Sequence, residues 1–359
     1  PALTGNFGRP GAGVCDVSGY FPVDSERLSR PDLAPSGLRE FNVLDLPRHI
    51  LDPGDQQPVK AVFIYNHNPV AVHPRQGDMC AALASDQLFV VGSDVSMTDS
   101  LAYADVILPA STSLEYGDLY KAYGHYYLQR SAPVLPPLGE SLPNTEMFRR
   151  LAARFGFEED CFRDSDEDLM DQAISPDCEA LQGLRPSQLP VDAAIDMSAT
   201  SSPGLLRGLP PATPSGKIEL FSPTLETASG QGLPRFKELS DARGFVLVSP
   251  ASERRINSTF GGEADHFDDL KCQMHPDDAV ALSLTDGEQV RLFNDAGEVL
   301  LPLCVTDSVR HGTVYVPKGA WINDSPTGQT INVLIPGHKA DLAGGACYYD
   351  CTVDIESAA

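Results

Sequence analysis

The sequence lacks a long apolar run. A membrane-spanning helix needs about 20 consecutive apolar residues, and the 359-residue chain contains no such stretch. The first residues, PALTGNFGRPGAGV, have neither the basic segment nor the apolar segment of a signal peptide, and they do not begin with Met. We therefore expect no direct insertion into a membrane, and we expect the chain to be part of a longer protein.

Basic residues are scarce relative to acidic ones. Lys and Arg number 26 against 50 Asp and Glu, which gives a formal net charge of -24 at pH 7. The negative field of such a surface repels the phosphates of nucleic acids and of anionic lipids. We therefore expect no nucleic-acid partner.

Several cofactor and catalytic motifs are also absent. No GxGxxG follows the first expected strand and no GxxxxGK(S/T) occurs, so the glycine signatures of NAD-binding and P-loop proteins are missing. No GxSxG frames a nucleophilic serine, and no CxxCxxxC is present to hold an iron–sulfur cluster. The eight cysteines are scattered, which favours free thiols in a reducing compartment. No histidine flanks the one close pair, Cys347 and Cys351, which argues against a zinc site there.

Residues 60–109 alternate short apolar runs with helical segments. Continuous apolar runs bounded by turn residues are typical of strands buried on both faces of a parallel sheet. Strands alternating with helices predict a Rossmann-like parallel sheet with right-handed crossovers. The expected strands are KAVFIYNHNP (60–69), DQLFVVGSD (86–94) and DVILP (105–109), with a fourth at GHYYLQR (124–130). The expected helices are GDMCAALASD (77–86) and MTDSLAYA (97–104).

An amphipathic helix is expected at NTEMFRRLAARFGF (144–157). Its apolar residues recur at helical spacing and therefore define one buried face. Asn144 or Thr145 is the expected N-terminal cap, and Gly156 is expected to end the helix.

The following segment is strongly acidic. Residues 158–171 hold eight acidic residues and one basic residue, which could form an acidic interaction tail. Ser165 and Asp168 have the spacing of a capping box, however, so a solvated helix is favoured. Residues 175–240 are rich in Pro, Gly and Ser. The whole of 158–240 is expected to be a linker that contains the acidic helix and a turn leading into a strand at TPSGKIELFS (213–222).

The last part of the chain has an all-β pattern. Short apolar strands are separated by turn signals such as Asp286-Gly287 and Ala296-Gly297, which predicts a barrel. The expected strands are FVLVSP, QVRLFND, GEVLLPLCVTD and GTVYVPK. The predicted fold class is α/β plus all-β, a Rossmann-like parallel sheet domain followed by a C-terminal β-barrel domain. The expected domains are a loop-rich remnant of a preceding domain (1–58), the α/β domain (59–157), the linker (158–240) and the barrel (241–359).

Three polar loops follow the expected strands. Open parallel sheets bind ligands at the carboxyl ends of their strands, where loops and helix N-termini converge. The loops here are NHNP, SDVSMTDS and PASTSLEYGD. An Asp at a strand end can accept two hydrogen bonds from a guanine edge or a ribose, and Ser or Thr can donate to phosphate. The loops therefore favour a nucleotide ligand; the alternative is that they are solvated connections.

Five segments, in the same order along the chain, resemble one family. Four are similar to segments of the molybdopterin oxidoreductases of the dimethyl sulfoxide reductase and formate dehydrogenase superfamily: LTGNFGRPGAG (3–13), NPVAVHP (68–74), MTDSLAYADVILPAS (97–111) and TPSGKIELFS (213–222). The fifth, HPDDAVALSLTDGEQVRLFNDAGEV (275–299), resembles the start of their C-terminal barrel, the molybdopterin dinucleotide-binding domain. The similarity runs from residue 3 to about residue 356.

The resemblance implies a molybdenum or tungsten centre held by two pyranopterin guanine dinucleotides. In the α/β part it implies cofactor binding by Asn66, Asn68, Pro69, Ser93, Asp94, Thr98, Gln129 and Asn144. In the barrel it implies binding by Ser252, Arg254, Arg255, Asn257, Ser258, Trp321, Asn332, Tyr348 and Tyr349. A multiply charged cofactor needs many fixed donors, which two guanidiniums in one loop can supply. The alternatives are that the two arginines form a surface pair and that Trp321 and the tyrosines are core aromatics.

Two departures from the family pattern limit what is implied. Family members carry, upstream, the domain that supplies the metal's protein ligand and often a four-cysteine motif. Any iron–sulfur (4Fe–4S) cluster would therefore lie in the missing N-terminal part. The usual GRxxxHxHT at the barrel start is replaced by SPASERRINST (249–259), which is similar to polysulfide and thiosulfate reductase-like enzymes.

The expected function is that of the C-terminal part of a molybdenum or tungsten oxidoreductase, for two-electron redox or oxygen-atom transfer. The metal and pterins would carry the chemistry, and this part would position them. We expect no catalytic and no metal-ligating residue in the chain, and no catalysis by the chain alone. The expected partners are the N-terminal half of the same protein and an electron-transfer subunit. The alternatives are a non-catalytic cofactor-binding module or subunit whose metal-ligating half is on another chain, and a nucleotide-binding domain fused to an unrelated barrel.

Overall fold

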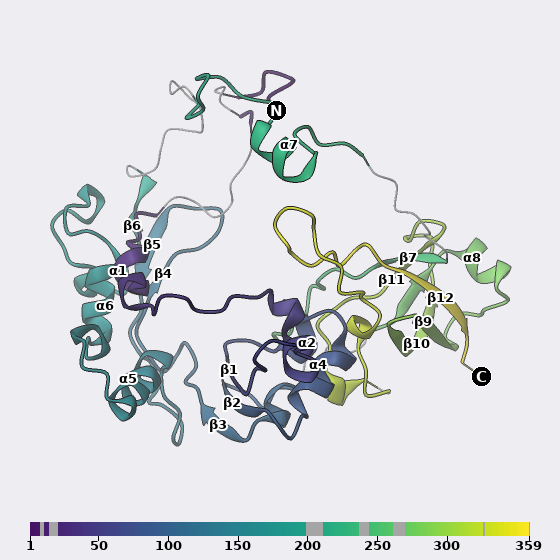
Figure 1. Ribbon diagram of the computed structural model, residues 1–359, viewed down its shortest axis with the longest axis horizontal. Coiled ribbons are helices and arrows are strands. Elements are labelled where there is room, and N and C mark those ends of the chain that lie inside the picture. Colours follow the sequence, from purple (N-terminus) through teal and green to yellow (C-terminus); the bar gives the residue numbers. More distant parts are fainter. Residues whose placement is uncertain are drawn as a thin grey trace. The chain divides into compact units, whose positions relative to one another are not determined.

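The computed structural model describes residues 1–7, 11–13, 21–198, 211–236, 244–260, 270–325 and 327–358. They form two compact units (Figure 1). Unit 1 comprises Pro1–Gly37 and Ser111–Lys237, and unit 2 comprises Leu38–Ala110 and Glu238–Ala359. Within the described ranges, no helix combines the length and the apolarity needed to cross a membrane.

Unit 2 contains a parallel sheet of three strands. The strands are β1 (Ala61–Tyr65), β2 (Phe89–Asp94) and β3 (Val106–Pro109), in the order β1-β2-β3. A Cβ on Gly92 of β2 would lie 2.9 Å from the side chain of Leu101, so this glycine allows the chain after β2 to pack closely on the strand. The parallel α/β layer is confirmed, whereas a Rossmann-like topology stays a prediction.

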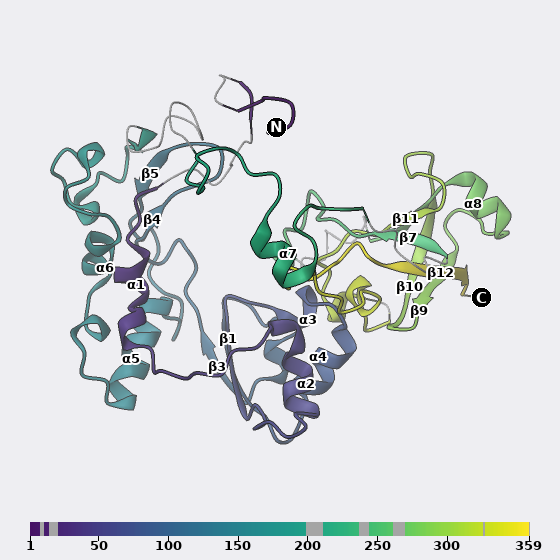
Figure 2. The same ribbon diagram turned by 45° about the horizontal axis from the view of Figure 1, so that its top comes forward.

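Two helices cover one face of this sheet. α2 (Leu46–Leu51) packs against α4 (Gln76–Leu83), and the two lie beside each other in Figures 1 and 2. On the opposite face Phe63, Tyr65 and Phe89 are 37%, 45% and 50% exposed. The expectation that these strands are buried on both faces is therefore wrong, because both helices pack on the same side. The core under the helices consists of Ile50, Ile64, Val70, Met79, Ala82, Leu83, Leu88 and Val90.

The helix expected at 97–104 is reduced to a 3-10 helix, η3 (Leu101–Tyr103). Thr98 Oγ1 accepts a hydrogen bond from Leu101 N at 3.2 Å, and Ser100 Oγ is bonded to another segment. Such side-chain bonds compete with the backbone bonds of a longer helix. The polar residues that follow β2 therefore remain in a loop at the carboxyl end of the strand.

A closed β-barrel forms the other layer of unit 2, as expected. Its strand order is β10-β8-β11-β7-β12-β9. Val299, Leu301 and Leu303 alternate along β10 and are buried, which is the periodicity that a barrel strand requires. The elements are β7 (Phe245–Val248), β8 (Cys272–Met274), α8 (Pro276–Ala281), β9 (Gln289–Asn294), β10 (Gly297–Val305), β11 (Thr313–Tyr315) and β12 (Thr352–Ser357).

A barrel loop is fixed to the sheet layer within unit 2. The loop carries the 3-10 helix η10 (Ile331–Val333), and the short helix α3 (Pro69–Val72) follows β1. Gln76 Nε2 donates to Thr330 Oγ1, and Thr330 N donates to Gln76 Oε1, both at 2.9 Å. Both residues are buried, so this pair satisfies polar groups that water does not reach.

Unit 1 contains an antiparallel sheet. Its strands are β4 (Leu119–Tyr120), β5 (Tyr127–Arg130) and β6 (Ile195–Asp196). The fourth strand expected at 124–130 thus forms in part, but its place beside the parallel strands is wrong. Leu128 of β5 packs instead into the core of unit 1, which consists of Phe21, Leu128, Ile174, Leu181, Leu189 and Met197.

The helices of unit 1 follow the sequence signals closely. α5 (Asn144–Phe155) ends at Gly156, which has the expected left-handed conformation. Its N-cap is Pro143, not Asn144 or Thr145, because the helix begins directly after the φ-restricted proline. α6 (Asp166–Ala173) begins with the expected capping box of Ser165 and Asp168. The other helices of this unit are α1 (Ser25–Ser29) and α7 (Pro223–Ser229).

The strand expected within 213–222 is wrong. Thr213 Oγ1 donates to Lys217 O at 2.7 Å, and Ser215 Oγ donates to Glu219 Oε1 at 2.7 Å. These local bonds close the expected turn, and the residues that follow it take no strand conformation. In the part of the chain that the structure describes, the remaining 3-10 helices are η1 (Pro31–Leu33), η2 (Val43–Asp45), η4 (Asp160–Phe162), η5 (Glu179–Leu181), η6 (Pro186–Gln188) and η9 (Ile322–Asp324).

Two further expectations concern the whole chain. Free thiols are found at Cys80, Cys161, Cys178, Cys272, Cys304, Cys347 and Cys351. Cys15 lies outside the described residues, as do 199–210 and 237–240 of the expected linker. The expected domain boundaries stay predictions.

Candidate functional site

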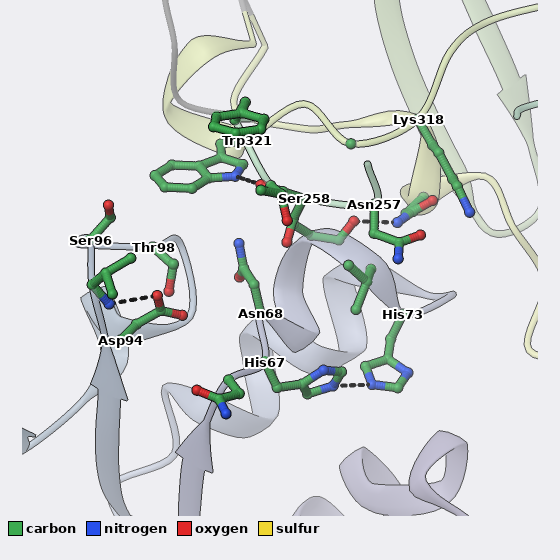
Figure 3. Close-up of a pocket in the computed structure, with 18 of the residues that line it drawn as sticks. His67, Asn68, His73, Asp94, Ser96, Thr98, Asn257, Ser258, Lys318 and Trp321 are labelled. Carbon is green, nitrogen blue, oxygen red and sulfur yellow. Dashed lines mark hydrogen bonds between the residues drawn. The ribbon is translucent and has the colours of Figure 1, made fainter. Parts of the chain in front are cut away.

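A cavity of about 820 Å³ lies in unit 2, between the carboxyl ends of β1 and β2 and the loops of the barrel (Figure 3). Open parallel sheets bind ligands at this edge, and the volume falls within the roughly 300–1,000 Å³ typical of small-molecule sites. The sheet layer contributes Asn66, His67, Asn68, Ala71, Val72, His73, Asp94, Val95, Ser96 and Thr98. The barrel contributes Asn257, Ser258, Thr259, Phe260, Lys318, Gly319, Trp321, Asn332 and Tyr348.

Asn68 presents a donor to this cavity. Its Oδ1 accepts hydrogen bonds from Ser100 N at 3.3 Å and from Ser100 Oγ at 2.6 Å, which fixes the side chain. Its Nδ2 is buried and has no hydrogen-bond partner among the described residues. Figure 3 shows the amide of Asn68 directed toward Ser258 and Trp321 across the cavity. A buried donor without a partner is costly, so this amide suits a ligand acceptor.

Asp94 presents an acceptor. It ends β2, and its Oδ1 accepts a hydrogen bond from Val95 N at 2.7 Å. Burial raises the pKa of this carboxyl group, and hydrogen bonds from the amides of Val95 and Ser96 oppose the rise only in part. The carboxylate is therefore partly desolvated and gains from N–H donors of a ligand.

The barrel wall is built from a strained loop. Phe260 has a φ of 63°, which is rare for a bulky residue. Asn257 and, across the cavity, Asn66 have φ values of 54° and 51°, which asparagine adopts more readily than other non-glycine residues. Trp321 Nε1 donates to Ser258 O at 2.8 Å and thereby holds the loop. A Cβ on Gly319 would lie 1.9 Å from Asn257 O, so only glycine permits this approach. Residues with such rarely populated backbone conformations are frequent at ligand-binding and active sites.

Charge is distributed unevenly around the cavity. Among the residues that line it, Lys318 is the single lysine or arginine, and its Nζ lies 5.6 Å from the centroid of the Tyr348 ring. Arg255 is fully buried behind this wall, and its Nε donates to Lys318 O at 3.4 Å. Lys318 and Asp94 lie on opposite sides of the labelled residues in Figure 3. An ionic ligand would therefore be oriented with its anionic group toward Lys318.

Two histidines form part of the sheet side of the cavity. His67 Nε2 and His73 Nε2 lie 2.8 Å apart, within hydrogen-bond distance. Burial lowers the pKa of both, and for His73, where the neighbouring His67 adds to the effect, the pKa falls to about 4. The pair is therefore neutral at pH 7.

Many of the residues predicted from the sequence meet in this cavity. They are Asn66, Asn68, Asp94, Thr98, Asn257, Ser258, Trp321, Asn332 and Tyr348. Others belong to unit 2 but do not line the cavity: Pro69, Ser93, Ser252, Arg254, Arg255 and Tyr349. Gln129 lies on β5 and Asn144 begins α5, both in unit 1. Contact of all these residues with a cofactor stays a prediction.

Some predicted residues have a structural role. Asn332 Nδ2 donates to Ala71 O, and Tyr348 OH donates to Val72 O, so one N–H of the Asn332 amide and the Tyr348 hydroxyl are used within the protein. Arg255 is buried, which excludes the alternative of a surface arginine at this position, whereas Arg254 is exposed. Tyr349 is 55% exposed and is not a core aromatic.

Several lining residues were not predicted: His67, His73, Ser96, Thr259, Phe260 and Lys318. His67 stands between two predicted asparagines in NHNP, so its place in the loop was a usable signal. Lys318 follows a strand in VYVPKG, where nothing in the sequence distinguishes it from other surface lysines.

Comparisons with known proteins agree with this architecture. Residues 245–352 match the family model described as "Molydopterin dinucleotide binding domain", and residues 44–154 match the one described as "Molybdopterin oxidoreductase". The chain is 34% identical over 364 residues to "Probable oxidoreductase YoaE" of Bacillus subtilis (strain 168), covering 99% of this chain and 53% of that protein. It is 27% identical over 343 residues to "Trimethylamine-N-oxide reductase" of Haemophilus influenzae (strain ATCC 51907 / DSM 11121 / KW20 / Rd), covering 83% and 41%.

The fold is also that of a solved structure. Acetylene hydratase from Pelobacter acetylenicus superimposes with a TM-score of 0.70 at 22% identity, covering 87% of this chain and 46% of that one. The chain spans about half the length of the curated relatives it matches. A parallel α/β layer and a closed barrel, with a ligand-sized cavity at the strand ends, thus form an architecture suited to binding a nucleotide-like ligand. The chain belongs to the molybdopterin oxidoreductase superfamily.

The matches support molybdopterin guanine dinucleotide, with molybdenum or tungsten, as the cofactor. The residues of the cavity fit the nucleotide part of such a group. Asn68 offers an unused buried donor, Asp94 offers a partly desolvated acceptor, and Lys318 offers a cation. The volume suits one small ligand, so the nucleotide part of a single dinucleotide is the largest portion that the cavity is expected to hold.

Proposed function

We propose that this cavity binds the guanine nucleotide end of one molybdopterin guanine dinucleotide. We further propose that the chain is the C-terminal, cofactor-binding part of an oxidoreductase for two-electron redox or oxygen-atom transfer. The observation that carries the proposal is the buried amide of Asn68, which lacks a partner within the described chain and is directed into the cavity. When bound, the metal and pterins would supply the redox chemistry, and the residues of this chain would bind and orient them.

The charges of the cavity give the proposed orientation. Guanine carries two adjacent N–H donor groups on one edge, which match the two oxygens of the Asp94 carboxylate. The diphosphate would lie toward Lys318, because Asp94 repels it and the ammonium group attracts it. Adenine has no N–H donor at the corresponding ring nitrogen, so the same carboxylate would disfavour adenine nucleotides.

A non-catalytic module is the alternative. It would bind the cofactor as a separate subunit or scaffold and leave the chemistry to residues on another chain. The observation that favours it is that one unit of this chain supplies the whole lining of the cavity. Both functions require the same nucleotide recognition, so the first experiment tests that recognition.

The test is binding of GDP-glucose and ADP-glucose to the 359-residue chain by isothermal titration calorimetry. These two diphosphate diesters differ in the base and share the sugar and the charge. We expect a preference for GDP-glucose, which Asp94→Asn reduces by about 1–3 kcal/mol, or roughly 5- to 150-fold. Asp86→Asn is the matched control, because Asp86 is exposed and precedes β2 at its other end. Equal affinity for the two probes would reject guanine recognition.

A further inference from the structure

The two histidines of the cavity form a pair whose hydrogen bonding is incomplete. His73 is 7% exposed, and its Nδ1 is buried with no hydrogen-bond partner among the described residues. Its Nε2 faces His67 Nε2 at 2.8 Å. Figure 3 shows the rings of His67 and His73 directed toward each other.

Neither neutral form of the pair satisfies every nitrogen. If His73 donates from Nε2, its Nδ1 is a buried acceptor without a donor. If His73 accepts at Nε2, its Nδ1 carries a buried N–H without an acceptor. Each arrangement leaves Nδ1 of His73 without a partner among the described residues, so no hydrogen bond of the protein fixes the protonation state of the pair.

Few charged groups act on this pair. His67 follows β1, and His73 is the C-cap of α3. The other ionisable side chains that line the cavity are Asp94 from β2 and Lys318 and Tyr348 from the barrel. Beyond the pair, the nearest charged residue along the chain is Arg75, which forms an ion pair with Asp78 on α4. Burial and the partner ring account for the lowered pKa of His73, so no anion of the protein holds a proton on it.

We propose that the His67–His73 pair takes up a proton from solvent when an anionic diphosphate occupies the cavity, which makes occupancy proton-coupled. This inference rests on the proposed function, because it requires the diphosphate to share the cavity with the histidines. One proton moves from water to an imidazole nitrogen, and no electron is transferred. The diphosphate offsets the positive charge that burial disfavours in the empty protein. The charged pair would still share one proton between the facing Nε2 atoms, and both Nδ1 atoms would then carry N–H groups, whose positive charge favours an anionic ligand in the same cavity.

The consequence is a pH-dependent affinity. By linkage, affinity rises as pH falls wherever the bound state holds more protons than the free state. We expect the affinity for GDP-glucose to increase up to about tenfold per pH unit between pH 7 and pH 5.5. GDP-glucose is the probe because its diphosphate is a diester and does not titrate in this range. Asp94 gives a change of the opposite sign, since N–H donors on its carboxylate would lower its raised pKa and release protons.

The test is calorimetry of GDP-glucose binding to the full chain at pH 6, in buffers of different ionisation enthalpy. The wild-type chain should take up close to one proton per molecule bound, and His67→Gln should abolish at least half of that uptake. His311→Gln is the control, because His311 is exposed and outside the cavity. The ring signals of His67 and His73 in NMR titrations should report a higher pKa with the probe than without it, which tests the idea even if a variant fails to fold.

The outcomes separate the two proposals. Binding of GDP-glucose with no proton uptake and no change in the histidine pKa values overturns the proton coupling and leaves nucleotide recognition intact. Absence of binding at every pH overturns both. Uptake that persists unchanged in His67→Gln overturns the assignment to this pair.

Discussion

Asn332 Nδ2 donates a hydrogen bond to the backbone carbonyl of Ala71, a residue 261 positions earlier in the chain. Tyr348 OH donates to the next carbonyl, that of Val72, at 2.8 Å. These are the last residues of α3, a helix of four residues whose end carbonyls have no partner within the helix. Loops of the barrel thus complete a helix of the sheet layer, and they hold one side of the cavity.

This relationship predicts a difference between two adjacent tyrosines. Tyr348→Phe removes the donor to Val72 O and leaves a carbonyl without its partner, so we expect a loss of about 1 kcal/mol in the free energy of unfolding. Tyr349→Phe should have no measurable effect, because Tyr349 is 55% exposed. Urea unfolding of the two variants gives the comparison. Equal stability would mean that the Tyr348 bond contributes nothing net.

The close approach at Gly319 predicts a large cost for one methyl group. Gly319→Ala would place a Cβ 1.9 Å from Asn257 O and would also impose a φ of +97° on alanine. Gly287→Ala is the control, because Gly287 has a φ of +83° with nothing within 4 Å of the added Cβ. The control should lose about 1–2 kcal/mol from backbone conformation alone, and Gly319→Ala should lose more than ~3 kcal/mol. Similar melting temperatures for the two variants would contradict the steric argument.

The raised pKa of Asp94 predicts opposite effects on stability and binding. A carboxyl group whose pKa is higher in the folded than in the unfolded chain binds protons preferentially when folded. The folded chain is therefore destabilised as the pH rises from 3.8, the ordinary pKa of this carboxyl group, through the higher pKa that it has in the folded chain. Asp94→Asn removes this loss, so we expect a more stable chain at pH 7 that binds GDP-glucose more weakly. Thermal unfolding of both chains between pH 4.5 and 7 measures the difference, which should shrink toward the acid end.

The lowered pKa of His73 makes the stability of the folded chain change with pH in the direction opposite to that of Asp94. The unfolded chain protonates this histidine near 6.5, whereas the folded chain does so near pH 4. Between these values the unfolded state binds more protons, so stability falls as pH decreases. At about 1.4 kcal/mol per pKa unit, the loss attributable to this residue is about 3.5 kcal/mol at most. His73→Gln should flatten the stability profile between pH 6.5 and pH 4, and an unchanged slope would place the linkage elsewhere.

The local elements were largely predictable from the sequence, and the contacts between them were not. Apolar runs with turn residues at their ends identify β1, β2 and β3, and Ser165 with Asp168 identifies the start of α6. The partner of Asn332 is a backbone carbonyl, and every residue has one, so no sequence pattern distinguishes Ala71. Residues 97–104 and 213–222 were misassigned because Ser and Thr side chains bond locally where backbone bonds were expected.

The site was predictable where its residues follow a strand. Asn66, Asn68 and Asp94 stand at strand ends, which is where a parallel sheet binds ligands. Lys318 reaches the same cavity only because the barrel folds against the sheet layer within unit 2. A fourth parallel strand at 124–130 would place Gln129 at the same edge of the sheet, but this strand belongs to the antiparallel sheet of unit 1, and Gln129 lies there with it.

The single cation of the lining predicts how the ligand's charge is recognised. Lys318→Met keeps the length of the side chain and removes the ammonium group, so the affinity for GDP-glucose should fall by about 1.5–3 kcal/mol. Guanosine, which has no phosphate, should bind both chains equally. Lys271→Met is the matched control, because Lys271 is exposed and outside the cavity. Added salt should weaken binding to the wild-type chain more than to Lys318→Met, since screening acts on the charge that the variant lacks. A loss of guanosine binding in Lys318→Met would instead assign this lysine to the shape of the cavity.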